Sequence, residues 1–106
     1  MDNLARECWQ VSEDHGFHDS GRTFAEAIAL VHSELSEALE AHRNGEPYVW
    51  MNGDKPDGVG VELADAIIRI FDLHCEIAPD DVSLEGLIRH KTQYNKTRGK
   101  LHGKRC

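Results

Sequence analysis

Two long segments of this chain repeat apolar residues at helical spacing, and a segment rich in glycine and proline separates them. The first segment begins at Thr23, where Glu26 completes a capping-box pattern three residues later, and it ends before Gly45. The second begins near Val61 and ends at Pro79, which cannot continue a helix. These two segments restrict the chain to a fold built on long helices.

The rest of the chain adds two shorter helices. Residues 3–14 have the spacing of a short amphipathic helix, and Ser83 is placed as the N-cap of a last helix. Residues 46–60 show no helical period, so we expect a loop without strands, and Pro56 interrupts any calcium-loop pattern there. The basic tail, residues 99–106, is expected to fray. The predicted fold class is therefore all-α.

Length and charge limit the partners of this domain. The 106 residues fit one domain, residues 1–106, whose small core makes self-association a reasonable expectation. The net charge of −7 argues against nucleic-acid polymers and anionic membranes as partners. The N-terminus lacks a secretory pattern, so we expect a cytoplasmic protein. Three widely spaced cysteines without a CxxC pair indicate neither a disulfide framework nor a thiolate zinc site.

The first long helix carries a carboxylate on its apolar face. At 3.6 residues per turn, Glu34 falls among Ala27, Val31 and Ala38, and Glu37 lies about 60° away at the border of that face. The opposite side carries polar residues and is expected to be solvated: Ser33, Ser36, Glu40 and Arg43. Leu35, Leu39 and Ile28 form a second apolar arc, which suggests more helix packing than one chain provides.

The second long helix has a polar stripe on an otherwise apolar surface. Glu62, Asp65, Arg69 and Asp72 share this stripe, and a helix that is apolar over most of its remaining surface is expected to be buried. An isolated buried carboxylate costs several kcal/mol, so something positive should compensate these acids. An ion pair between Arg69 and Asp72 is a structural alternative for part of the stripe.

Two carboxylate pairs at i and i+3 on two helices form the pattern by which helical bundles hold divalent metals. Glu34, Glu37, Glu62 and Asp65 offer only oxygen ligands, which suit Mg²⁺, with Mn²⁺ as a substitute, better than zinc or copper. Each pair alone is common on solvated helix surfaces. Their placement on apolar faces favours a metal site.

The same residues carry a resemblance to a known family. Glu34-x-x-Glu37, followed after 24 residues by Glu62-x-x-Asp65, resembles the bipartite acidic signature of the MazG-like nucleoside triphosphate pyrophosphohydrolases. The resemblance extends over most of the chain, through the stretches IALVHSELSEALEAHR, KPDGVGVELADAIIRIFDLH and HKTQYNKTRGKLHGK.

The resemblance implies a bundle of four to five helices in which the two acidic helices face each other, assembled as a dimer or a tetramer. It implies Mg²⁺-dependent hydrolysis of a (deoxy)nucleoside triphosphate to the monophosphate and pyrophosphate, for nucleotide-pool cleaning or supply. The four acids match the metal ligands of the family. Ser33 stands where some members carry a further acid, so Glu34 or Glu37 is left to accept the proton of the attacking water.

Substrate contacts are expected from two other regions. Lys91, Asn95 and Arg98 lie at i, i+4 and i+7 on one edge of the last helix and offer donors to phosphate oxygens; solvated surface charges are the alternative for Lys91 and Arg98. Phe17 and His18 occupy the region where relatives place a base-stacking aromatic, and Trp50 is a further candidate wall.

Two other functions remain open from the sequence. One is a non-catalytic, metal-stabilised helical interaction module, in which an ion neutralises the acids and no nucleotide binds. The other is a diphosphatase of the dUTP/dUDP type that uses the same carboxylates. Nothing in the sequence sets the base, the sugar or the number of metal ions.

Overall fold

The chain is mainly helical, with one small hairpin. The computed structural model describes residues 3–4, 6–7, 10 and 22–98. Between residues 22 and 98 the elements are α2 (Phe24–Arg43), β1 (Trp50–Asn52), β2 (Lys55–Asp57), α3 (Val59–Ile77) and α4 (Leu84–Arg98). Residues of the predicted N-terminal helix that are described are helical, and the tail 99–106 lies outside the described part. None of the described helices has the length and apolar composition of a membrane span.

Helix α2 begins and ends at the predicted signals. The Thr23 side chain accepts a hydrogen bond from the Glu26 backbone N–H at 3.1 Å, and the Glu26 carboxylate accepts one from the Thr23 N–H at 3.0 Å. This capping box satisfies two backbone donors at the helix start that have no partner within the helix. At the other end, Asn44 is the C-cap and Gly45 follows with a φ of 70°, the left-handed conformation that commonly ends helices.

The segment after α2 is not a plain loop, so the expectation of no strand is wrong. Strands β1 and β2 pair antiparallel, with Asn52 opposite Lys55, so that Gly53 and Asp54 form a two-residue connection. Gly53 has a φ of 67°, which a tight hairpin turn requires at its first central position. The turn at Gly53 therefore forms a hairpin in a segment whose glycines and prolines indicate only a break between helices.

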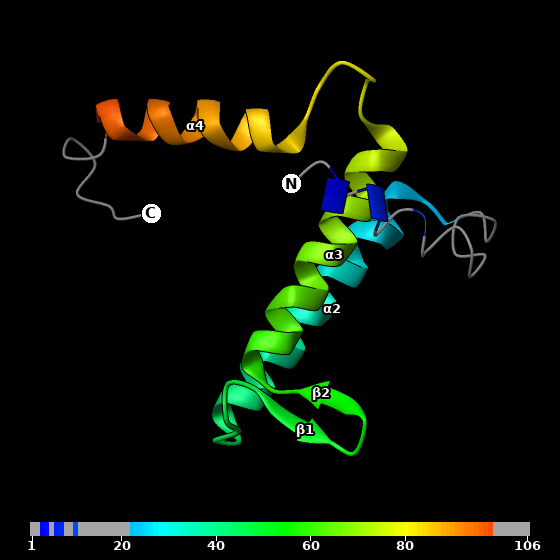
Figure 1. Ribbon diagram of the computed structural model, residues 1–106, viewed down its shortest axis with the longest axis vertical. Helices are drawn as coiled ribbons and strands as arrows, with labels where there is room; N and C mark the ends of the chain where they lie inside the picture. The colour runs from blue at the N-terminus through cyan, green and yellow to red at the C-terminus, as the bar shows by residue number, and fades with distance from the viewer. Residues whose placement is uncertain (1–2, 5, 8–9, 11–21, 99–106) are drawn as a thin grey trace.

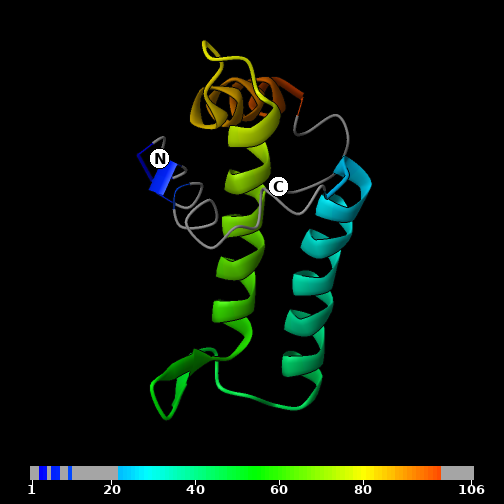
Figure 2. The ribbon, with the colours of Figure 1, turned by 90° about the vertical axis from the view of Figure 1, so that its right-hand side faces the viewer.

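The ends of α3 and α4 also follow local chemistry. Helix α3 ends at Ile77, two residues before Pro79, as expected. Ser83 accepts a hydrogen bond from the Gly86 N–H at 2.9 Å, which confirms it as the residue that opens α4. Figures 1 and 2 show α4 projecting sideways from the end of α3, away from the rest of α2 and α3.

Helices α2 and α3 form the body of the structure and run antiparallel, side by side (Figure 2). The core between them is small and rich in alanine, and its buried apolar residues are Ala27, Val31, Ala38, Ala41, Ala66 and Phe71. Small side chains at a helix contact allow the two helix axes to approach closely. Polar groups that lie on the facing sides of α2 and α3 are consequently brought within reach of each other.

Helix α3 is less buried in one chain than its apolar surface predicts. Leu63, Ile67 and Ile70 are exposed, and so are Leu35 and Leu39 of the second apolar arc on α2. The expectation that α3 is buried is therefore wrong for the described part of a single chain. The physical reason is that α3 packs mainly against one neighbour, α2, so the sides of α3 that face away from α2 stay open.

Candidate metal centre

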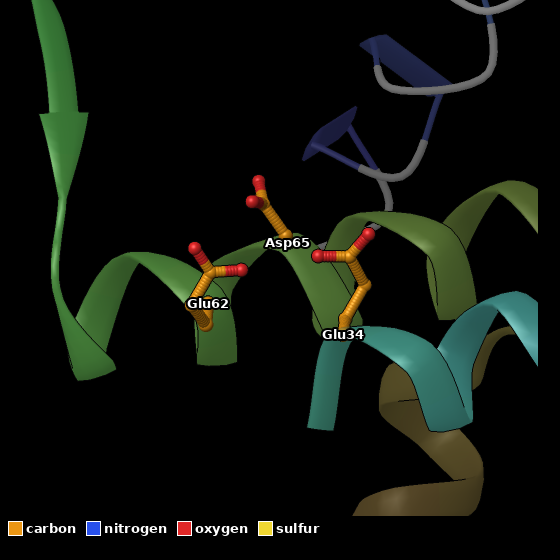
Figure 3. Close-up of side chains that lie close together, drawn as sticks. All are labelled: Glu34, Glu62 and Asp65. Carbon is orange, nitrogen blue, oxygen red and sulfur yellow. The ribbon is translucent and has the colours of Figure 1, made fainter. Parts of the chain in front are cut away.

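Three carboxylates from the two long helices converge on one point. Glu34 from α2 and Glu62 and Asp65 from α3 each offer an oxygen within 4.8 Å of the oxygens of the other two. Figure 3 shows Glu62 and Asp65 on successive turns of α3, with Glu34 reaching toward them from α2. The predicted pairing of the two acidic helices is therefore found in the structure for these three residues.

The burial of Glu34 follows from its place on α2. This side chain lies on the same helix face as Val31 and Ala38, and only 9 % of Glu34 is exposed. The residues predicted to form the opposite, solvated side of α2 are all exposed: Ser33, Ser36, Glu40 and Arg43. The helical period alone thus predicted correctly which carboxylate of α2 is taken out of water.

Glu37, the fourth predicted ligand, lies at the edge of the trio. Its side chain is exposed, and it is hydrogen-bonded to the carboxyl group of Glu62. Two carboxyl groups can share such a bond only when one of them holds a proton. The hydrogen bond and the charge of Glu37 therefore both favour the protonated form of Glu62.

The pKa values of Glu62 and Asp65 on α3 are both raised. Burial, then the hydrogen bond and charge of Glu37, and then the charges of Asp65 and Glu34 raise the pKa of Glu62 to about 7. Burial and the charges of Glu34 and Glu37 also raise the pKa of Asp65, while the charges of Arg69 and Lys55 lower it. A cation placed among these oxygens would compete with protons for them.

One oxygen in the cluster has nothing to bind among the described residues. Glu62 Oε2 is buried and accepts no hydrogen bond there. Leaving a buried acceptor unpaired costs about 1–3 kcal/mol, and more when it is charged. The unpaired atom lies in a set of oxygen-only donors, and this set fits a hard divalent cation such as Mg²⁺.

Two arginines supply positive charge to the α2–α3 interface. Arg69 Nε donates to Glu34 Oε1 at 3.0 Å, and Arg22 Nη2 donates to Asp72 Oδ2 at 3.3 Å. The pairing between Arg69 and Asp72 that we considered from the sequence is wrong. Arg69 pairs with Glu34 of α2, and Asp72 pairs with Arg22, which precedes α2. Arg69 is the site residue whose role the sequence did not assign; its signal was its position one turn after Asp65 in the polar stripe.

The predicted phosphate-binding edge does not reach the carboxylates within one chain. Lys91, Asn95 and Arg98 are exposed on α4. From Asp65 to Ile77 at the end of α3 is about 18 Å of helix, and α4 leads away from that end (Figure 1). The structure therefore does not bring the α4 residues together with the acids.

The α4 edge instead has local contacts. The Lys91 ammonium lies 4.7 Å from the centre of the Tyr94 ring, and the Arg98 guanidinium lies 5.1 Å from it. Arg98 also donates to the Tyr94 hydroxyl. Of the aromatic candidates, Trp50 donates to Glu46 at 3.0 Å, whereas Phe17 and His18 lie outside the described residues.

The raised pKa of Glu62 predicts a pH dependence of stability in the cation-free protein. The pKa rises from 4.5 in the unfolded chain to about 7 in the folded chain, so the stabilisation is complete below about pH 4.5 and is lost as pH rises through 7. We expect the melting temperature in EDTA to fall by several degrees between pH 5 and pH 8. Subtracting the melting-temperature curve of Glu62→Gln from that of the wild type removes the contribution of the histidines, which both proteins share. Parallel curves for the two proteins would contradict the assignment.

Comparisons with protein-family models, with curated proteins and with solved structures found no match to this chain.

Proposed function

We propose that this protein is a Mg²⁺-dependent nucleoside triphosphate pyrophosphohydrolase of the MazG-like kind, which hydrolyses a (deoxy)nucleoside triphosphate to the monophosphate and pyrophosphate. The observation that supports the proposal best is the convergence of Glu34, Glu62 and Asp65 from two helices within 4.8 Å. The unpaired buried oxygen of Glu62 adds to it. The sequence resemblance supplies the reaction, and the geometry supplies a place where divalent cations would be held.

The proposed cation is one that prefers oxygen ligands. Glu34, Glu62 and Asp65 would hold it, with Glu37 at the open edge, and neither histidine nor cysteine belongs to the described cluster. Mg²⁺ typically keeps some of its water and binds substrate phosphates together with one or two protein carboxylates. When bound, it would neutralise charge on the triphosphate and acidify the attacking water. Mn²⁺ would substitute because it uses the same ligand type.

The two glutamates of α2 then have separate roles in our proposal. Glu34 is buried and its Oε1 is engaged by Arg69, whereas Glu37 is exposed at the edge of the cluster. We therefore assign to Glu37 the acceptance of the proton from water as the oxygen attacks the α-phosphorus. The bond from the α-phosphorus to its bridging oxygen breaks, and pyrophosphate leaves with the electron pair.

Substrate binding in this proposal requires more than one chain. Lys91, Asn95 and Arg98 would bind the triphosphate from α4 of a neighbouring copy, because α4 leads away from the acids of its own chain. Phe17 and His18 would contact the base. The exposed Leu35, Leu39, Leu63 and Ile67 offer apolar area for a homodimer or homotetramer, which sedimentation at micromolar concentration would detect.

Product analysis tests the proposed reaction directly. We expect one or more canonical NTPs or dNTPs, incubated with the protein and Mg²⁺, to yield monophosphate and pyrophosphate in equal amounts, and EDTA to stop the reaction. Chromatography separates the nucleotides and identifies the preferred base. Accumulation of diphosphate would indicate stepwise phosphate removal instead of pyrophosphate release. Turnover of both dUTP and dUDP would favour the diphosphatase alternative.

A second function is favoured by one observation. The exposed α4 edge stands apart from the carboxylates and contacts Tyr94 of its own helix, as expected of a surface with no triphosphate to bind. A non-catalytic, metal-stabilised interaction module would account for this. Such a module is stabilised by Mg²⁺ or Mn²⁺ and gains nothing from added nucleotide, whereas a substrate site raises the melting temperature with nucleotide occupancy.

A further inference from the structure

The ion pair between Arg69 and Glu34 shares a carboxylate with the proposed metal site. Arg69 Nε lies 3.0 Å from Glu34 Oε1, and Glu34 is 9 % exposed. The same Glu34 is one of the three carboxylates that converge within 4.8 Å. One buried carboxylate is thus shared between a resident guanidinium and the position where a cation would bind.

The remaining acids show why a resident charge is needed. Three carboxylates converge within 4.8 Å, and Arg69 is the cation paired with one of them among the described residues. Arg69 follows Asp65 by four residues on α3, so both side chains lie on the same helix face. Arg69 therefore neutralises the cluster from within the helix that supplies two of its ligands.

A cation that enters this cluster meets an attractive set of acids and one repulsive arginine. Even at a water-like dielectric constant, a unit positive charge about 6 Å from a divalent ion weakens its binding about tenfold. The same arginine charge stabilises the cation-free protein, because a buried carboxylate without a partner is strongly destabilising. The two opposing effects can be measured separately.

We infer that Arg69 is a built-in counter-ion that stabilises the empty carboxylate cluster and competes with the divalent cation for Glu34. Removing its charge makes the cation-free protein less stable and makes the cation bind more tightly. Arg69 is a positioning residue, since it acts through Glu34 and the bound cation. The inference rests on the proposed function in so far as that function places a cation at these acids.

The structure offers a matched control for this inference. Arg22 bridges α2's start to Asp72 of α3 at 3.3 Å, so it also links the two long helices through a buried carboxylate. Asp72 lies two turns beyond Asp65 and belongs to no acid trio in the described residues. Arg22→Gln should therefore reduce stability without changing cation affinity.

The test is titration calorimetry with Mg²⁺ or Mn²⁺ alone, at a temperature where circular dichroism shows the variants folded. We expect Arg69→Gln to bind the cation about tenfold more tightly than the wild type and to melt at a lower temperature in EDTA. Arg69→Lys should bind within about twofold of the wild type because it keeps the positive charge. Arg22→Gln should do the same because the charge that it removes is distant from the trio and is screened. Equal or weaker binding by Arg69→Gln, with a wild type that binds, would overturn the inference and leave the proposed function standing.

A second measurement uses the wild-type protein and covers the case in which Arg69→Gln does not fold. The Nε–H signal of Arg69, assigned in nitrogen-15 spectra by its loss in Arg69→Lys, should exchange slowly with solvent in EDTA. Mg²⁺ should accelerate that exchange as the cation displaces the guanidinium from Glu34. An unchanged signal at saturating Mg²⁺ would overturn the competition, whereas absence of any cation binding by both the wild type and the variant would remove the proposed metal centre itself.

Discussion

Glu62→Gln and Asp65→Asn should each lower the rate of pyrophosphate release by at least ~100-fold, since the cation that these acids would hold contributes several kcal/mol to the transition state. Both residues belong to the convergent trio, and neither amide can replace a carboxylate's charge. The measurement is initial velocity at saturating Mg²⁺ with the nucleotide that the product assay identifies. Turnover close to that of the wild type in both variants would contradict the proposed reaction.

A neutral change elsewhere on α2 provides the control for these variants. Glu40→Gln removes the same kind of charge from the exposed side of α2, so its turnover should stay within about twofold of the wild type, as expected of a solvated surface charge. Glu62→Gln should also melt at a higher temperature than the wild type in EDTA, because the crowded carboxylate is gone, and it should lose the stabilisation by Mg²⁺. Gain of stability together with loss of turnover separates a ligand from a residue that only supports the fold.

The second large effect is expected at the start of α3. Gly58→Ala should lower the free energy of unfolding by ~3 kcal/mol or more, which combines a left-handed backbone with a steric clash. Gly58 has a φ of 114°, and a Cβ built there would lie 2.5 Å from the carbonyl oxygens of Pro47 and Tyr48. Backbone atoms cannot rotate away, so the chain between α2 and α3 would have to shift. Urea unfolding measures the loss.

Two other glycines separate the causes of this effect. Gly53 has a φ of 67° with no atom within 4 Å of a built Cβ, so Gly53→Ala should cost about 1–2 kcal/mol from the backbone alone. The three atoms nearest to a Cβ built at Gly60 all belong to the ring of Tyr48, and Tyr48 is 64 % exposed. A side chain can move more easily than backbone carbonyls, so Gly60→Ala should be milder than Gly58→Ala. Equal losses at positions 53 and 58 would show that the carbonyl contacts contribute nothing.

Short-range signals explain why much of the helical part could be predicted. The capping box at Thr23, the serine at position 83 and the stop near Pro79 each act through hydrogen bonds or sterics within a few residues. The hairpin was not predicted because its strands pair through the turn at Gly53, whereas the glycines and prolines of residues 46–60 indicate only that the helical period stops there. Local chemistry therefore identified where helices end and missed what lies between them.

The candidate site divides in the same way. The 3.6-residue period placed Glu34 on the buried face of α2 and aligned Glu62, Asp65 and Arg69 along α3, because these relations hold within a single helix. The period could not show which charge meets which across the interface. Arg69 pairs with Glu34, 35 positions away, and Asp72 pairs with Arg22, 50 positions away.

The sequence by itself determined the long helices, their caps and the burial of one acid on α2, since each depends on neighbours within a turn or two. Only the tertiary structure decided that three carboxylates lie within 4.8 Å, that Arg69 takes Glu34 as its partner, and that α4 leads away from them. The physical reason is that these distances depend on how closely α2 and α3 pack through alanines such as Ala38 and Ala66. Helix separation is a property of two surfaces, and no local pattern in one helix encodes it.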